Sequence, residues 1–330
     1  MTKSGFEPAF TRRAWMAAGG AAAVSTLLPA GAARAAAPAA GRQVPGIYRY
    51  RIGEFELTAI NDGANMMTLK DGFVRNAAFE DVKASLHDAF LPTDVVAIPF
   101  NQLVVNTGRK LVLIDTGTGG QLAPTAGRLV ENMEAAGLDA KSVDTVIISH
   151  FHSDHILGLR TKEGAAVFPN AEVFVGEAEY AFWMDDGQMS RAPEGQKTTF
   201  QNVRKIFGPM AKDLTRYTGE QELVPGIVAH EAFGHTPGHM IFRISSGGDQ
   251  VLFLSDTTNH PALFVRNPGW HAVFDMDPVM AEATRRRVLD MAAAERLKVQ
   301  GYHFPFPGHG YIAKEADRYR YVPAGWLPVI

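Results

Sequence analysis

The sequence predicts an α+β fold, an αββα sandwich in which two β-sheets pack face to face and helices cover their outer faces. Three observations support this prediction. Strand-like segments come first, a helical segment follows, and the same order repeats in the second half of the chain. With 46% hydrophobic residues, a chain of 330 residues can bury the large core that two packed sheets require. After about residue 46, no change of composition or internal repeat divides the sequence.

The first half of this pattern contains hairpins followed by a helix. The expected elements are hairpins at residues 47–62 and 101–117, a helix at residues 123–137 and a short apolar strand at residues 143–149. Each hairpin has a glycine at its turn, and the helix ends at a glycine, which favours chain reversal there. The apolar strand carries His150 at its C-terminal end.

The second half repeats this arrangement with longer helices. Strands are expected at residues 171–176, 226–233, 239–245 and 250–256, and helices at residues 177–184, 198–214 and 277–298. The last helix leads into residues 299–312, where a short strand is expected to end at His303. A Ser-Gly-Gly-Asp turn joins the third and fourth of these strands as a hairpin.

The first 35 residues have the pattern of an export signal. Arg12 and Arg13 precede an Ala- and Gly-rich apolar run, and Ala33-Arg34-Ala35 is a small-x-small cleavage site. The segment resembles a bacterial twin-arginine signal, which implies a periplasmic or secreted protein cleaved near Ala35. A membrane anchor is the alternative, but the run is interrupted by Gly and Pro and is short for a spanning helix of about 20 residues. Residues 36–45 are typical of a linker, and residues 46–330 are expected to form one domain.

Composition narrows the choice of partners. The formal net charge of −3, without a run of Lys or Arg, argues against nucleic acid and against a membrane surface. The chain has no cysteine, so disulfides and thiolate metal ligands are excluded. A small molecule is the expected partner, and the sequence does not decide whether the protein forms a homodimer.

Three histidines and an aspartate stand within six residues as H-x-H-x-D-H. His150 and His152 lie where a strand gives way to a loop, so their side chains can point to the same side, and Asp154 and His155 follow in the next turn. Imidazole and carboxylate ligands suit Zn²⁺. A single tetrahedral ion rarely takes four ligands from six consecutive residues, so the motif predicts two metals. The alternative is a solvated polar loop.

Three distant residues can complete such a site. His239 follows a Pro-Gly turn before a strand, Asp256 ends a strand, and His303 ends another short strand. Side chains at strand ends can converge above one edge of a sandwich, so we expect all three to be ligands. His235, which precedes the same Pro-Gly turn, is expected to be a supporting residue.

With these motifs the sequence resembles the metallo-β-lactamase superfamily over nearly the whole mature chain. The resemblance implies two zinc ions per chain. The implied ligands are His150, His152 and His239 for the first zinc, Asp154, His155 and His303 for the second, and Asp256 as the bridge between them. The D-T-G motif at residues 115–117 implies that Asp115 lies beneath the metals and supports a ligand.

Such a pair of cations favours hydrolysis. A zinc-bound water has its pKa lowered from 15.7 toward about 7, so a hydroxide held between the metals is available at neutral pH. The more open zinc can polarise a carbonyl or phosphoryl oxygen, and Asp154 or Asp256 can receive a proton. Esters, lactones and phosphotriesters all suit this chemistry.

Local motifs indicate a branch of the superfamily. F-P-N-A-E-V-F-V, H-T-P-G-H and G-Y-H-F-P-F-P-G are similar to methyl parathion hydrolase and its lactone- and aryl-ester-cleaving relatives. The candidate pocket residues are Leu122, Trp183, Phe200, Asn259, His260 and His309. Leu122 stands where this branch implies an aromatic residue, and Asn259 and His260 lie where acyl-homoserine lactonases typically have a tyrosine.

We therefore expect a dinuclear-zinc hydrolase of hydrophobic esters or lactones, with phosphotriesters as further substrates. The alternatives are an acyl-homoserine lactonase, a β-lactamase side activity, a mononuclear-iron persulfide dioxygenase and a non-catalytic binding protein. Asp256 disfavours a dedicated β-lactamase, since many have cysteine or serine at this position. His303 and the complete second ligand set argue against the iron enzyme.

Overall fold

The computed structural model describes residues 39–330, of which Val44–Ile330 form one compact unit. The expected export signal, with its cleavage site near Ala35, lies outside the described residues. Within residues 39–330, no helix is long and apolar enough to cross a membrane.

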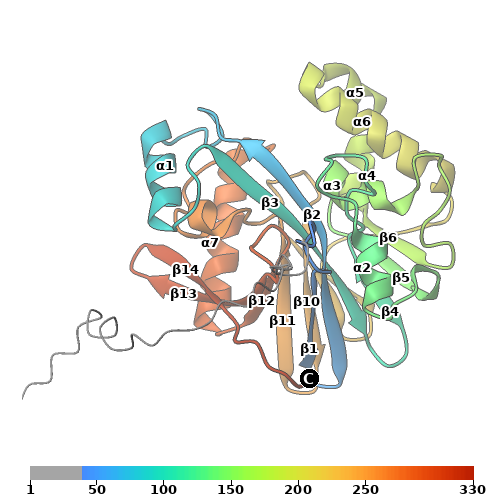
Figure 1. Ribbon diagram of the computed structural model, residues 1–330. Helices are drawn as coiled ribbons and strands as arrows, with labels where there is room; N and C mark the ends of the chain where they lie inside the picture. Colours follow the sequence, from blue (N-terminus) through green and yellow to red (C-terminus); the bar gives the residue numbers. More distant parts are fainter. Residues whose placement is uncertain (1–38) are drawn as a thin grey trace, which may run out of the picture. The chain divides into compact units, whose positions relative to one another are not determined.

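Two seven-stranded sheets form the centre of this unit (Figure 1). The first contains, in spatial order, β1 (Ile47–Ile52), β2 (Phe55–Thr68), β3 (Val95–Asn106), β4 (Leu111–Ile114), β5 (Thr145–Ile148), β6 (Glu172–Gly176) and β7 (Leu214–Tyr217). Strands β1 to β4 pair antiparallel, and β4 to β7 pair parallel. The parallel strands therefore end at one common edge of the sheet.

The second sheet has the same number of strands. Its spatial order is β14 (Arg318–Pro323), β13 (His309–Glu315), β12 (Lys298–Gly301), β11 (Asp249–Ser255), β10 (Met240–Ser246), β9 (Ile227–Glu231) and β8 (Gln221–Val224). Only β11 and β12 pair parallel among these described strands. Their C-terminal ends consequently meet, and the residues that follow them are brought together.

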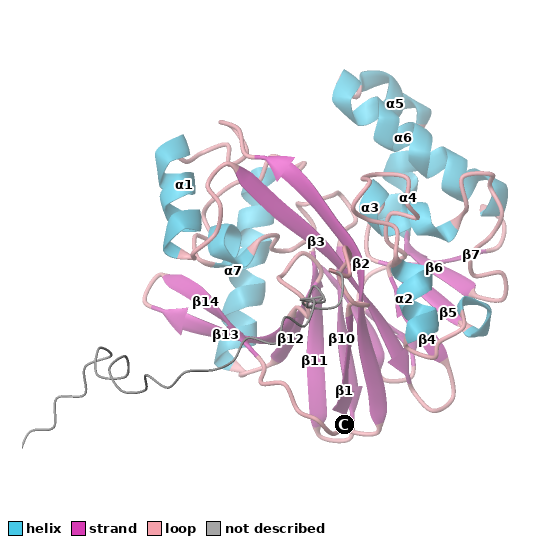
Figure 2. Ribbon diagram, in the orientation of Figure 1, coloured by secondary structure: helices cyan, strands magenta, loops and turns pink. Residues whose placement is uncertain are grey.

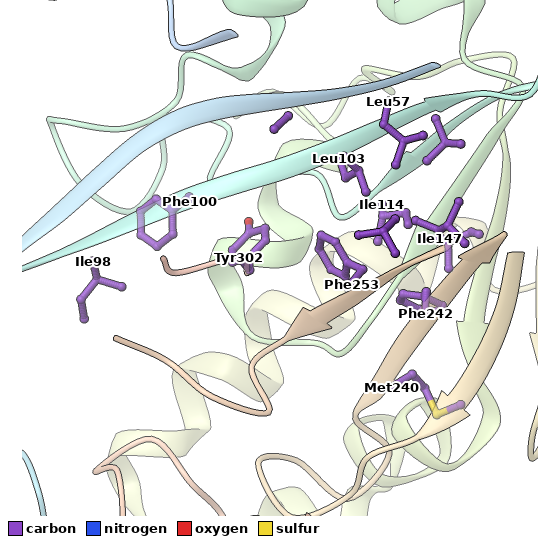
Figure 3. Packing of buried hydrophobic residues seen from close by; sticks show 14 of the residues in the cluster. Leu57, Ile98, Phe100, Leu103, Ile114, Ile147, Met240, Phe242, Phe253 and Tyr302 are labelled. Carbon is purple, nitrogen blue, oxygen red and sulfur yellow. The ribbon is translucent and has the colours of Figure 1, made fainter. Parts of the chain in front are cut away.

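The sheets pack through a shared hydrophobic core. Figure 3 shows Leu57, Ile114 and Ile147 of the first sheet facing Phe242 and Phe253 of the second. All five side chains are fully buried. Each buried side chain of this size contributes about 1.5–3 kcal/mol relative to an exposed one, so this interface fixes the relative position of the sheets.

Helices cover the outer faces of both sheets (Figure 2). They are α1 (Phe79–Asp88), α2 (Leu129–Ala135), α3 (Ser153–Ile156), α4 (Glu177–Met184), α5 (Asp186–Arg191), α6 (Glu194–Phe207), α7 (Pro278–Ala294), the 3₁₀ turns η1 (Ala140–Ser142), η2 (Leu157–Leu159) and η3 (Gly208–Met210), and the π-helical turn η4 (Pro261–Val265). Helices α2, α4 and α6 pack on the first sheet, and α7 packs on the second. The αββα prediction is confirmed.

Three predicted helices are too long. The one expected at residues 277–298 ends at Ala294, and β12 begins at Lys298. The helix expected at residues 123–137 begins only at Leu129, because the backbone N–H groups of Gly127 and Arg128 bond to the carbonyl of Asp62 on β2 and hold the preceding turn. The helix expected at residues 198–214 ends at Phe207, where Gly208 and Pro209 follow, and the chain then enters β7.

Candidate metal centre

The candidate site lies where the parallel strands of the two sheets end. His150 lies just after β5, and His152 immediately precedes the short helix α3 that carries Asp154 and His155. The second sheet supplies Asp256 after β11, His303 after β12 and His235 in the turn before β10. Segments far apart in the sequence thus meet at one edge of the sandwich.

These side chains form two groups of ligating atoms. His150, His152, His235 and Asp256 make the first cluster, and Asp154, His155 and His303 make the second. Within each cluster, one ligating atom from every residue lies within 4.8 Å of the others.

Asp256 faces both clusters. Its Oδ2 is 3.2 Å from His235 Nε2 of the first cluster and 3.0 Å from His303 Nε2 of the second. Its Oδ1 is 3.2 Å from His155 Nε2. A carboxylate in this position can bridge two cations.

The donor set fits a pair of divalent cations. Within residues 39–330, His150 Nε2 is buried without a hydrogen-bond partner, and His155 Nε2 and Asp256 Oδ1, although 3.2 Å apart, form no aligned hydrogen bond. His152 Nδ1 and His235 Nε2 lie 2.9 Å apart, a distance at which one ring nitrogen donates a proton to the other and which brings two ligating nitrogens together. Buried polar atoms normally have partners, and imidazole with carboxylate is the ligand set that zinc prefers.

The structure exchanges the roles predicted for His235 and His239. The described clusters contain His235 rather than His239. Both ring nitrogens of His239 are engaged, because Nδ1 donates to Ala232 O at 2.9 Å and Nε2 accepts the backbone N–H of Asp256 at 3.0 Å. His239 therefore positions the bridging residue, and His235 presents a ligating nitrogen.

Polar groups that contact Nδ1 orient the imidazole rings of two ligand residues. His155 Nδ1 lies 2.8 Å from Asp115 Oδ2, and His303 Nδ1 lies 2.9 Å from Pro99 O. Asp115 therefore lies in the supporting position that the sequence implied. Such contacts fix the tautomer that leaves the other ring nitrogen free for a metal.

Sequence reasoning missed the equivalent partner of His235. Asp275 Oδ1 lies 2.9 Å from His235 Nδ1, and Asp275 Oδ2 accepts from the buried Arg285 at 2.9 Å. No local motif marks Asp275, which lies in the irregular segment before α7.

Ionisation within the first cluster also suits a cation. Burial lowers the pKa of His150 well below its ordinary value and that of His152 to about 3, so both imidazoles are neutral at pH 7. Burial opposes the charge of Asp256, but His303, His155 and His235 outweigh it and hold the pKa of Asp256 well below the usual range. The cluster therefore combines neutral imidazoles at His150 and His152 with an ionised carboxylate, while Asp256 and Asp275 overcome burial and raise the pKa of His235 to about 9.

A cavity of about 370 Å³ opens onto both clusters. Among the candidate pocket residues, Leu122, Trp183 and Asn259 line it, together with Asp154 and Asp256. Its other walls carry the apolar side chains of Met67, Ile98, Phe100, Val273, Phe274 and Met276 beside the polar side chains of Asn65, Gln196 and Thr199.

Three candidate pocket residues lie elsewhere. Phe200 is fully buried behind Trp183, with ring centroids 4.6 Å apart, because α6 turns its apolar face inward. His260 lines a separate groove beside α1 and β14. His309 stacks on Tyr50 at 3.9 Å, since it begins β13 at the opposite side of the Pro-Gly turn. These residues contact the core or another surface rather than the cavity.

Comparisons with known proteins agree with this geometry. A curated N-acyl homoserine lactonase of a Bacillus species is 21% identical over 227 residues, which cover 63% of this chain and 83% of that protein. The solved structure of AidC, a dizinc quorum-quenching lactonase in complex with the product N-hexanoyl-L-homoserine, is 27% identical with a TM-score of 0.82, and the match covers 86% of this chain and 99% of that one. The hydrolase AbOPH is also 27% identical, with a TM-score of 0.81 and 87% and 100% coverage.

A family model agrees with these individual matches. The model of the metallo-β-lactamase superfamily matches residues 99–303, which contain every residue of both clusters. The chain therefore belongs to the metallo-β-lactamase superfamily.

Proposed function

We propose that this protein is a dinuclear-zinc lactonase that opens lactones carrying a hydrophobic chain, with N-acyl homoserine lactones as the preferred class. The observation that carries the proposal is the largely apolar cavity of about 370 Å³ above seven converging ligating residues. The protein is a metal-dependent hydrolase of ester bonds, and the lactonases among its relatives support the choice of substrate.

Each cluster would hold one cation. His150, His152 and His235 would hold the first, Asp154, His155 and His303 the second, and Asp256 would bind both. When bound, two divalent cations supply an activated water and polarise the carbonyl of the substrate. This assignment differs from the sequence expectation only in taking His235 in place of His239.

The side chains around the clusters orient the substrate. Asp154 and Asp256 line the cavity, where either carboxylate would accept a proton from the attacking water and pass it to the departing ring oxygen as the lactone opens. Asn259 also lines the cavity, and its side-chain amide would face the polar part of the substrate. The apolar walls, among them Ile98, Phe100 and Phe274, exclude water and receive the acyl chain.

Aryl phosphotriesters and aryl esters are the second candidate class. The aromatic side chains of Phe100, Trp183 and Phe274 line the cavity and offer surfaces on which an aryl leaving group can pack. The same metal chemistry serves both classes, so the cavity walls decide between them.

A substrate panel tests the choice. For the zinc-loaded protein, we expect kcat/KM for N-hexanoyl homoserine lactone to exceed that for the N-acetyl compound by up to about 200-fold, because four additional CH₂ groups at about 0.8 kcal/mol each enter an apolar cavity. Proton release in weak buffer measures both reactions. Equal values for the two lactones, or a higher kcat/KM for a diethyl aryl phosphotriester or a β-lactam, would contradict the lactonase proposal.

A further inference from the structure

A buried carboxylate outside both clusters connects the segments that carry the first cluster. Glu179 lies on α4 and is 1% exposed. Its Oε1 accepts from Phe151 N at 2.9 Å and from Trp183 Nε1 at 2.7 Å. Its Oε2 accepts from Thr236 Oγ1 and from Gly238 N, both at 2.8 Å. Four donors from three separate segments thus converge on one side chain.

The two main-chain donors belong to ligand-bearing segments. Phe151 lies between His150 and His152 in the sequence. Its side chain packs in the hydrophobic layer between the first sheet and its helices, not in the site. Gly238 closes the turn that begins with His235. Glu179 therefore contacts the backbone on both sides of the first cluster while contributing no atom to either described cluster.

The turn also packs directly on α4. A Cβ on Gly238 would lie 2.2 Å from the backbone nitrogen of Glu179, so only glycine fits there. Neither segment can shift without breaking bonds to the carboxylate or separating from the helix.

Packing alone does not account for an acid at this place. Burial raises the pKa of Glu179, which shows that desolvation opposes its charged form. An apolar side chain of similar volume would avoid that cost. What an apolar side chain cannot do is accept four hydrogen bonds from groups that are otherwise buried and unpaired.

We propose that Glu179 is the positioning residue of the first cluster: by bonding to Phe151 and to the 236–238 turn, it sets the spacing between the His150–His152 pair and His235 that the first zinc requires. This inference rests on the proposed dinuclear site. Through Trp183 Nε1, the same carboxylate also fixes one wall of the substrate cavity.

Glu179→Gln is the sharpest test, because the amide preserves volume. With its oxygen toward Phe151 and Trp183, the amide NH₂ can donate to Thr236 Oγ1, but it cannot accept from Gly238 N. We expect zinc affinity at the first cluster to fall about 10-fold, the lower end of the range for residues that orient ligands. Stepwise zinc titration against a chromogenic chelator, in a His303→Ala background that disables the second cluster, measures this affinity directly.

Asp62→Asn is the matched control. Asp62 is another fully buried carboxylate, and it accepts from Thr118 N, Thr118 Oγ1 and Leu129 N, away from the segments that carry ligands. Its variant should lower the melting temperature of the metal-free protein without changing the zinc affinity of the first cluster. Equal zinc affinities in the Gln variant and the background protein would overturn the positioning role.

A second variant and the recovery of kcat by added zinc provide two further tests of the positioning role. If Glu179→Gln does not fold, Thr236→Val, which removes one hydroxyl donor, should still weaken the first zinc several-fold, and unchanged affinity would overturn the inference. In the otherwise unaltered protein, zinc above the weakened dissociation constant should restore kcat of the Gln variant. An unaltered protein that binds fewer than two zinc ions would instead contradict the proposed function itself.

Discussion

Replacing Asp256 by Ala should lower lactone hydrolysis by at least about 100-fold and reduce bound zinc from two ions per chain to one or none. Its two carboxylate oxygens face His235, His155 and His303 across both clusters. Loss of a residue that merely orients a ligand costs about 10–100-fold, and a shared ligand should cost more. Elemental analysis of purified protein, together with initial rates of proton release, measures both effects.

The control for this variant is Asp317→Ala, at an exposed turn position between β13 and β14. It removes the same carboxylate from a solvated place and should leave both zinc content and rate unchanged. Circular dichroism of Asp256→Ala should match that of the unaltered protein, because the sheets pack through apolar side chains and Asp256 is not one of them. Two bound zinc ions with near-normal turnover would remove Asp256 from the bridging position.

His235→Ala should reduce hydrolysis at least about 100-fold, whereas His239→Ala should reduce it about 10-fold. The first change deletes a ligating nitrogen of the first cluster, and the second deletes the acceptor of the Asp256 backbone N–H. The two residues have the same type and lie four positions apart around one turn, so each variant is the control of the other.

Zinc titration distinguishes the two roles independently of rate. Excess zinc should return much of the activity of His239→Ala, because its ligand set is complete, and less of the activity of His235→Ala. The reverse order, with His239→Ala the variant that loses a metal, would restore the assignment made from sequence and contradict the geometry described above.

The H-x-H-x-D-H motif was enough to predict a metal centre, because its spacing at the end of a strand restricts where four side chains can point. The choice between His235 and His239 was not accessible in this way. Both flank one Pro-Gly turn, and only the tertiary contacts of His239 with Ala232 and Asp256 show which ring faces inward. The supporting residues Asp275 and Glu179 belong to no motif, since their role depends on which segments the fold brings beside them.

The fold itself was predictable from the repeated order of strands and helices, but some element ends were not. Gly127 and Arg128 lie within a helical period, yet their backbone bonds to β2 delay the start of α2. For the residues that line the cavity, His309 and Phe200 show the same limit of prediction from sequence. The resemblance favoured Phe200 and the preceding Pro-Gly turn favoured His309 as pocket residues, whereas Trp183 lies between Phe200 and the cavity, and His309 packs on Tyr50 away from the cavity.

If two metal ions held by these seven residues perform the hydrolysis, activity must follow metal content. The most direct measurement removes all metal from the purified protein by chelation and then follows N-hexanoyl homoserine lactone hydrolysis while zinc is added in known amounts. We expect no turnover without metal and activity that reaches its plateau at two zinc ions per chain. A plateau at one ion per chain, restoration by iron but not zinc, or turnover by the metal-free protein would contradict the dinuclear account.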